Sequence, residues 1–177
     1  MGIIFVIALR LLLPITIFRW PLLGGILCLI ADALDIVILD IIDTGGFSDY
    51  HSTDKYMDVV YLSVEAFVSL RWKNQLAKKV NIYLFVYRWI GFILFEITKI
   101  RVFLLIFPNL FENFYLFYLS YKKIAKRDRL TSIRPMVLVL LLLLIPKLGQ
   151  EFLLHFLEAK PWGWIIENIL HPLNIPI

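Results

Sequence analysis

Aspartates are concentrated in one stretch of this sequence. Residues 31–58 contain seven of them, half of all the acidic residues in a chain of 177. Carboxylates near an apolar phase are costly, and several side by side cannot all stay ionised without compensation. This stretch is therefore the main candidate for chemistry.

Four of these aspartates are expected to converge. At about 100° per residue, Asp32 and Asp35 fall on one arc of a helix, and Asp54 and Asp58 fall on one arc of the next. Because a short loop joins the two helices, we expect them to be antiparallel neighbours with their acidic faces together. The other three aspartates more simply solvate a helix end and a loop: Asp40, Asp43 and Asp49.

A positive charge is expected among these carboxylates. A divalent metal ion, Mg²⁺, Mn²⁺ or Ca²⁺, is the economical candidate, because such ions select all-oxygen ligation by carboxylates. The predicted metal ligands are Asp32, Asp35, Asp54 and Asp58, and residues 44–52 add hydroxyls and one imidazole. Bound protons are an alternative, as are three basic side chains: Arg10, Lys55 and Arg88.

The four aspartates also resemble a family motif. CDP-alcohol phosphotransferases are polytopic enzymes that move a phosphatidyl-type group from a CDP-activated donor to an alcohol. They carry D-x2-D-G-x2-A-R-x8-G-x3-D-x3-D across two successive helices. Asp32-Ala-Leu-Asp35 is similar to the first pair and Asp54-Lys-Tyr-Met-Asp58 to the second, with an interval one residue longer. The resemblance covers under a fifth of the chain.

The resemblance implies a metal-dependent transferase acting on a phospholipid or CDP-activated headgroup. The aspartates would hold the metal ions, and Asp58, the last of the motif, would act as the base on the acceptor hydroxyl. The family's first glycine is replaced by Ile36 and its Ala-Arg pair by Leu39-Asp40. Because that arginine is missing, Arg88 is the candidate to bind phosphate in its place. Other parts of the chain are similar to uncharacterised bacterial membrane proteins.

The elements that carry these residues are apolar. The chain is 60% hydrophobic, its mean hydropathy is +0.81, and its charged residues, 18% of the total, are bunched. This composition predicts an all-α, polytopic integral membrane bundle, with residues 1–177 forming a single membrane domain. The one cysteine, Cys28, lies in an apolar run, so we expect a buried thiol and no disulfide.

Apolar windows between turn and charge signals predict about six transmembrane helices. Three prolines mark kinks or ends: Pro14, Pro108 and Pro146. A short C-terminal interfacial helix is expected near residues 162–170. The predicted transmembrane helices lie near residues 2–18, 22–43, 56–72, 80–107, 109–121 and 136–157.

Basic residues predict the orientation. They lie at Arg19, within 71–79 and within 122–134, which are the first, third and fifth connections. The positive-inside rule places these connections in the cytoplasm, and the acidic stretch on the opposite face, unlike the site of the family that it resembles. We expect a bacterial inner, or thylakoid-type, membrane. The run at 122–134 reads as a topology signal that touches anionic lipid, and nucleic acid is not an expected partner.

Polar residues in other apolar segments have simpler explanations. Arg88 and Glu96 lie eight residues apart on nearly one face, so each could reach across to a neighbouring helix, where a buried structural ion pair is the simpler explanation. Asn109 and Glu112 are expected to cap a helix N-terminus. A helical face at 151–158 carries Glu, His and Glu, more simply an interfacial histidine than a metal site.

Three functions stay open from the sequence. The first is the metal-dependent membrane enzyme, with a phospholipid substrate. The second is a cation or proton transport protein in which the same acids form a binding station. The third is a nonenzymatic subunit whose acids are neutralised by a structural ion or by a partner. The expected surroundings are the lipid bilayer, with a membrane-complex partner or a second copy of the chain.

Overall fold

The structure is a computed structural model that describes residues 2–41, 50–100, 102–126, 128 and 130–152. Side chains are described for these residues except 2–3, 35–41, 50–56 and 151. The described helices are α1 (Gly2–Arg19), α2 (Pro21–Ile41), α3 (Tyr50–Ser69), α4 (Gln75–Thr98), α5 (Val102–Ile106), α6 (Leu110–Ala125) and α7 (Ile133–Glu151).

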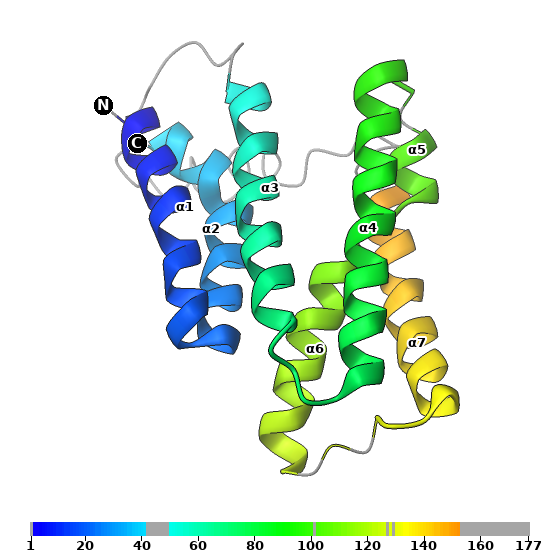
Figure 1. The fold of residues 1–177 in the computed structure, drawn as a ribbon. Coiled ribbons are helices and arrows are strands. Elements are labelled where there is room, and N and C mark those ends of the chain that lie inside the picture. Colours follow the sequence, from blue (N-terminus) through cyan, green and yellow to red (C-terminus); the bar gives the residue numbers. More distant parts are fainter. Residues whose placement is uncertain (1, 42–49, 101, 127, 129, 153–177) are drawn as a thin grey trace, which may run out of the picture. The chain divides into compact units, whose positions relative to one another are not determined.

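The all-α prediction is confirmed for this part of the chain, which contains helices and no strand (Figure 1). Three stretches are long and apolar enough to cross a membrane: Gln75–Thr98, Val102–Ala125 and Ile133–Gln150. The second covers both α5 and α6. The predicted interfacial helix near 162–170 lies outside the described residues.

The predicted helix over 80–107 is wrong in its limits. The helix begins earlier, because Asn74 caps it by accepting a hydrogen bond from the Ala77 backbone N–H at 3.0 Å. It ends at Thr98, and Lys99 adopts a left-handed conformation with φ 58° while its backbone N–H bonds the Phe95 carbonyl oxygen. Neither glycine nor proline marks this end, so the sequence pattern does not reveal it.

Of the three prolines expected to mark kinks or ends, one separates two helices and two lie inside helices, where a kink stays a prediction. Pro108 separates α5 from α6, as expected of a residue that cannot donate a backbone hydrogen bond. Pro14 lies inside α1 and Pro146 inside α7, and both helices continue through them. A membrane-type helix tolerates proline when neighbouring groups satisfy the released carbonyl.

The described chain divides into two compact units, with the boundary between Val64 and Glu65 inside α3. Unit 1 contains α1, α2 and α3 as far as Val64, and unit 2 contains the rest of α3 and α4 to α7. Because α3 contributes to both units, the single-domain expectation stays a prediction.

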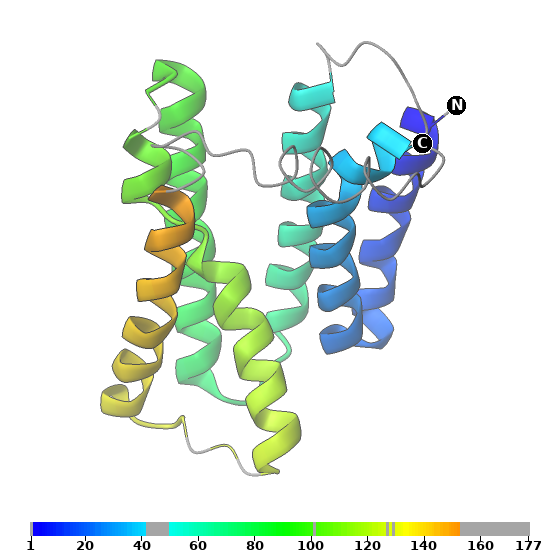
Figure 2. The same ribbon diagram turned by 180° about the vertical axis from the view of Figure 1, so that it is seen from behind.

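In unit 1, α1 and α2 form a tight hairpin that lies side by side in both views (Figures 1 and 2). Only Trp20 separates the two helices, and Pro21 opens α2, a position that suits its fixed φ. At Gly24, an added Cβ would lie 2.6 Å from the Ile17 backbone nitrogen, so only glycine allows this close approach. Cys28 is buried as expected.

In unit 2, α4 packs against α5 and α6, and α7 packs against both of these (Figure 2). The core is aromatic: α6 supplies four fully buried rings, Phe111, Phe114, Tyr115 and Tyr118. Trp72, just beyond α3, stacks on Tyr115 with ring centroids 5.6 Å apart and lies 4.3 Å from Tyr118. These rings join the end of α3 to α6.

Candidate functional site

Arg10 is the centre of the polar site in unit 1. It lies in the middle of α1, whose only other charged residue is Arg19 at the end. The Arg10 side chain is 3% exposed, and its Nη2 atom donates to Oδ1 of Asp32 on α2 and to Oδ1 of Asp58 on α3. One guanidinium therefore holds three helices together.

The structure brings two of the four predicted ligands together. Asp32 and Asp58 bond the same nitrogen atom, so their carboxylates lie beside each other although 26 residues separate them in sequence. Their side chains are 31% and 38% exposed. This partial exposure leaves the pair within reach of an ion or a polar ligand.

Asp35 and Asp54 lie one helical turn from this pair. Asp35 follows Asp32 by three residues on α2, and Asp54 precedes Asp58 by four on α3, spacings that put side chains on one helix face. The side chains of Asp35 and Asp54 lie outside the described residues. The four aspartates and Arg10 carry a formal net charge of −3, so Arg10 does not neutralise the set.

The metal prediction is only partly matched by described side chains. Among these, no group of three Asp, Glu, His or Cys residues could hold a metal ion. Asp32 and Asp58 supply two carboxylates, and the remaining predicted ligands are the two aspartates just placed by their backbones. A metal ion at this position stays a prediction, as does the contribution of residues 44–49, which are not described.

Arg88 belongs to a different part of the molecule from the aspartates. It lies on α4 in unit 2, where its Nη1 atom donates to the Phe107 carbonyl oxygen at 2.9 Å. The guanidinium that bonds Asp32 and Asp58 is that of Arg10, one of the alternatives named from the sequence. The sequence contains a signal for these bonds, because a lone charge in the middle of an apolar helix must find a counter-charge.

The other polar pairs expected from the sequence are partly different. Glu96 forms an ion pair with Lys99, three residues away, and this pair is exposed instead of buried between helices. Glu112 lies in the first turn of α6, as predicted, but the Asn109 side chain makes no cap to the α6 backbone. It donates instead to Oε2 of Glu112 at 3.1 Å. The helical face at 151–158 lies outside the described side chains.

Two polar features of unit 2 were not singled out as sites from the sequence. Asn74, besides capping α4, donates to Asp128 Oδ1 at 3.0 Å and to the Leu130 carbonyl oxygen at 2.9 Å. Tyr118 donates its hydroxyl to the other oxygen of Asp128. The second feature is that two buried side chains, Glu65 and Asn81, have polar atoms with no hydrogen-bond partner in the described part of the chain.

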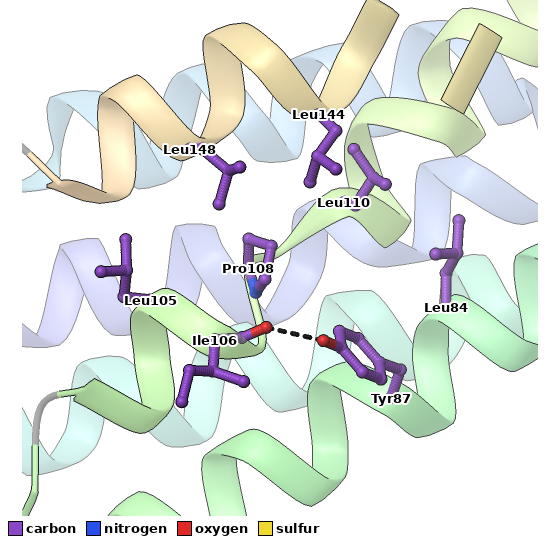
Figure 3. Close-up of a pocket in the computed structure, with 8 residues that line it drawn as sticks. All are labelled: Leu84, Tyr87, Leu105, Ile106, Pro108, Leu110, Leu144 and Leu148. Carbon is purple, nitrogen blue, oxygen red and sulfur yellow. Dashed lines mark hydrogen bonds between the residues drawn. The ribbon is translucent and has the colours of Figure 1, made fainter. Parts of the chain in front are cut away.

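Unit 2 also contains an apolar cavity of about 360 Å³ between α4, α5, the start of α6 and α7 (Figure 3). Tyr87 supplies its hydroxyl, which donates to the Ile106 carbonyl oxygen at 2.6 Å. Such a lining suits an acyl chain better than a charged headgroup. The cavity is lined by Leu84, Tyr87, Leu105, Ile106, Pro108, Leu110, Leu144 and Leu148.

Comparison with known proteins adds no relative to this picture. No protein-family model, no curated protein and no solved structure matches the chain. The function must therefore be argued from the residues of the two units themselves.

Proposed function

We propose that this chain is an integral membrane protein of a bacterial inner, or thylakoid-type, membrane, with its basic connections in the cytoplasm. Support comes from the three helices long and apolar enough to span a bilayer. Large apolar side chains are also exposed along α7, among them Leu138, Leu142 and Ile145, at 60%, 61% and 71%. Apolar exposure of this extent suits contact with lipid better than contact with water.

We further propose that unit 1 is the active site of a metal-dependent transferase acting on a phospholipid or CDP-activated headgroup. One observation carries the proposal: Asp32 and Asp58, on different helices, meet at the buried Arg10. Two more aspartates lie a turn away on the same helices, and the set keeps a negative formal charge that favours a divalent cation. The partial exposure of Asp32 and Asp58 suits a site that opens to a ligand.

Each residue has a role in this proposal. Asp32, Asp35, Asp54 and Asp58 would hold the ion, which when bound supplies positive charge against the phosphate oxygens. Asp58 would also accept the proton of the acceptor hydroxyl. In this proposal Arg10 binds the phosphate in place of Arg88, because the Arg10 guanidinium lies beside the aspartates and matches a phosphate in geometry.

Release of CMP tests the transferase directly. Purified protein in lipid vesicles would be given CDP-diacylglycerol, Mg²⁺ or Mn²⁺ and a panel of alcohol acceptors. We expect metal-dependent CMP release, reduced at least about 10²-fold by Asp58→Asn and unchanged by Glu96→Gln, an acid of unit 2 paired with Lys99. Bound metal without CMP release from any donor and acceptor would contradict the transferase while leaving the metal site standing.

A second function is favoured by the same ion pairs. Arg10 already supplies a cation to Asp32 and Asp58, as expected of a nonenzymatic subunit of a membrane complex whose acids are structural. In that case neither metal nor substrate would bind, and Arg10→Gln would reduce stability without any catalytic effect. Measuring metal content and stability on the same variants separates the two functions.

A further inference from the structure

Glu65 is a buried acid that the proposed function does not use. It lies on the part of α3 that belongs to unit 2, its side chain is fully buried, and neither carboxyl oxygen has a hydrogen-bond partner among the described residues. Ser69, one turn further on, is equally buried, so this face of α3 is turned to the interior. An ionised carboxylate in such a place costs far more than a neutral one.

A second acid lies close to Glu65. Glu112, in the first turn of α6, interacts electrostatically with Glu65 and is itself 4% exposed. Both residues belong to unit 2. Two neighbouring carboxyl groups away from water cannot both keep a negative charge without a cation or a proton. Glu112 therefore makes a negative charge on Glu65 still less favourable without a cation or a proton.

A third helix of unit 2, α4, also carries a buried polar side chain. Asn81 on α4 is fully buried, and neither its Nδ2 nor its Oδ1 has a hydrogen-bond partner within the part of the chain described. Phe85, one turn further along α4, contacts Phe111 with ring centroids 5.2 Å apart. The helices α4 and α6 pack against each other in unit 2, and they run antiparallel (Figure 1).

Several other titratable side chains described in unit 2 have partners of their own. From α6, Tyr115 and Tyr118 face the interior, and the Tyr118 hydroxyl is bonded to Asp128. On α4 the basic Arg88 is bonded to the Phe107 carbonyl oxygen, and on α7 the buried Lys147 donates to Gln150 at 3.1 Å. The aromatic side chains of Phe111, Phe114 and Trp72 are also buried in unit 2.

We propose that Glu65 is a proton-binding site in the interior of unit 2, with Glu112 as the neighbouring acid. The proton is held on a Glu65 oxygen, and the buried carboxyl group is then neutral. A proton needs a single oxygen, whereas a metal ion needs several, and the described residues supply no group of three metal-binding side chains here. The site is separate from the aspartates of unit 1 and does not depend on their function.

A hydrophobic carbodiimide tests this site in the intact protein. Dicyclohexylcarbodiimide enters apolar regions, takes the proton of a carboxyl group and bonds the resulting carboxylate, so it modifies protonated buried acids. After treatment at neutral pH, peptide mass spectrometry should find the adduct on Glu65 and not on Glu96, which is paired with the exposed Lys99. Equal modification of both acids, or none on Glu65, would overturn the proposal.

Sodium chloride distinguishes a proton from a metal cation. If Glu65 holds a proton, replacing potassium chloride with an excess of sodium chloride leaves the extent of modification unchanged. Protection of Glu65 by sodium would overturn the proposal in favour of a sodium site, since the bound ion would displace the proton.

Infrared spectroscopy gives a second readout that does not depend on reagent access. The wild-type protein should show the carbonyl band of a protonated carboxyl group at neutral pH. The isosteric Glu65→Gln variant should lose intensity equal to one carboxyl group and melt at the same temperature or higher, because a neutral amide replaces a neutral acid. Glu96→Gln should keep the band. A Glu65→Gln variant that keeps the full band, or unfolds at a clearly lower temperature, would show that Glu65 is ionised.

Discussion

Arg10 is the side chain on which the acidic site of unit 1 depends. Its guanidinium is almost completely buried, whereas the two carboxylates that it binds are about one third exposed. A buried charge is tolerated only with a partner, and removing one member of such a pair costs more than the pair contributes. The loss of Arg10 should therefore affect folding before it affects any ligand.

We expect Arg10→Gln to lower the free energy of unfolding by about 2 kcal/mol, less than for a fully buried pair because water screens the two carboxylates. Thermal unfolding in detergent measures this difference. Arg19→Gln, an exposed arginine on the same helix, is the matched control and should change stability by less than about 0.5 kcal/mol.

Adding Asp58→Asn to Arg10→Gln should restore part of the loss, because the second change removes a carboxylate left without its cation. Equal effects of Arg10→Gln and Arg19→Gln, or strictly additive effects in the double variant, would mean that the bonds from Arg10 to Asp32 and Asp58 contribute nothing in solution.

At the scale of elements, the sequence predicts helices well and their ends poorly. Long apolar runs mark α1, α2 and α7, because an apolar stretch of about 20 residues is typical of a membrane helix. The end of α4 is hidden, since Lys99 reaches its left-handed conformation without a glycine. Likewise, spacing alone put Asp32 and Asp58 on facing helices, but only the fold shows that Arg10 is their common cation.

The cap of α4 should be worth more than an ordinary one. Asn74 caps the helix and also bonds two residues of the segment that follows α6. We expect Asn74→Ala to lower the unfolding free energy by about 2 kcal/mol, the upper end of the usual range for a cap. Ser132, at the N-cap of α7, makes no side-chain cap bond, so Ser132→Ala is the control, with little effect.

The hairpin of α1 and α2 should tolerate no side chain at Gly24. Gly24→Ala would place a methyl group 2.6 Å from the Ile17 backbone, so we expect a loss of about 1–3 kcal/mol from overpacking. Gly149→Ala on α7 meets no atom within 4 Å and should gain up to about 1 kcal/mol from helix propensity. Unfolding curves that show the two variants to be alike would contradict the tight hairpin.

At the scale of the whole molecule, the proposed topology puts the acidic stretch and the basic connections on opposite sides of the membrane. Cysteine labelling tests it, because Cys28 is the only native cysteine and can be changed to serine. In that background, Ser48→Cys should react with an impermeant maleimide on intact cells. Ile124→Cys, at an 81% exposed position in the last turn of α6 before the basic connection, should react only after permeabilisation. The reverse pattern would place the basic connections outside.

Binding of a divalent cation to unit 1 is the central claim, and one titration tests it most directly. Bound metal and melting temperature would be measured together as Mn²⁺ is added to wild type, Asp58→Asn and the control Glu96→Gln. An ion at about a hundred times its dissociation constant should raise the melting temperature by about 5–10 °C. We predict this rise, with bound Mn²⁺, in wild type and Glu96→Gln and its absence in Asp58→Asn. The same response in all three proteins, or no bound Mn²⁺ in wild type, would contradict the account.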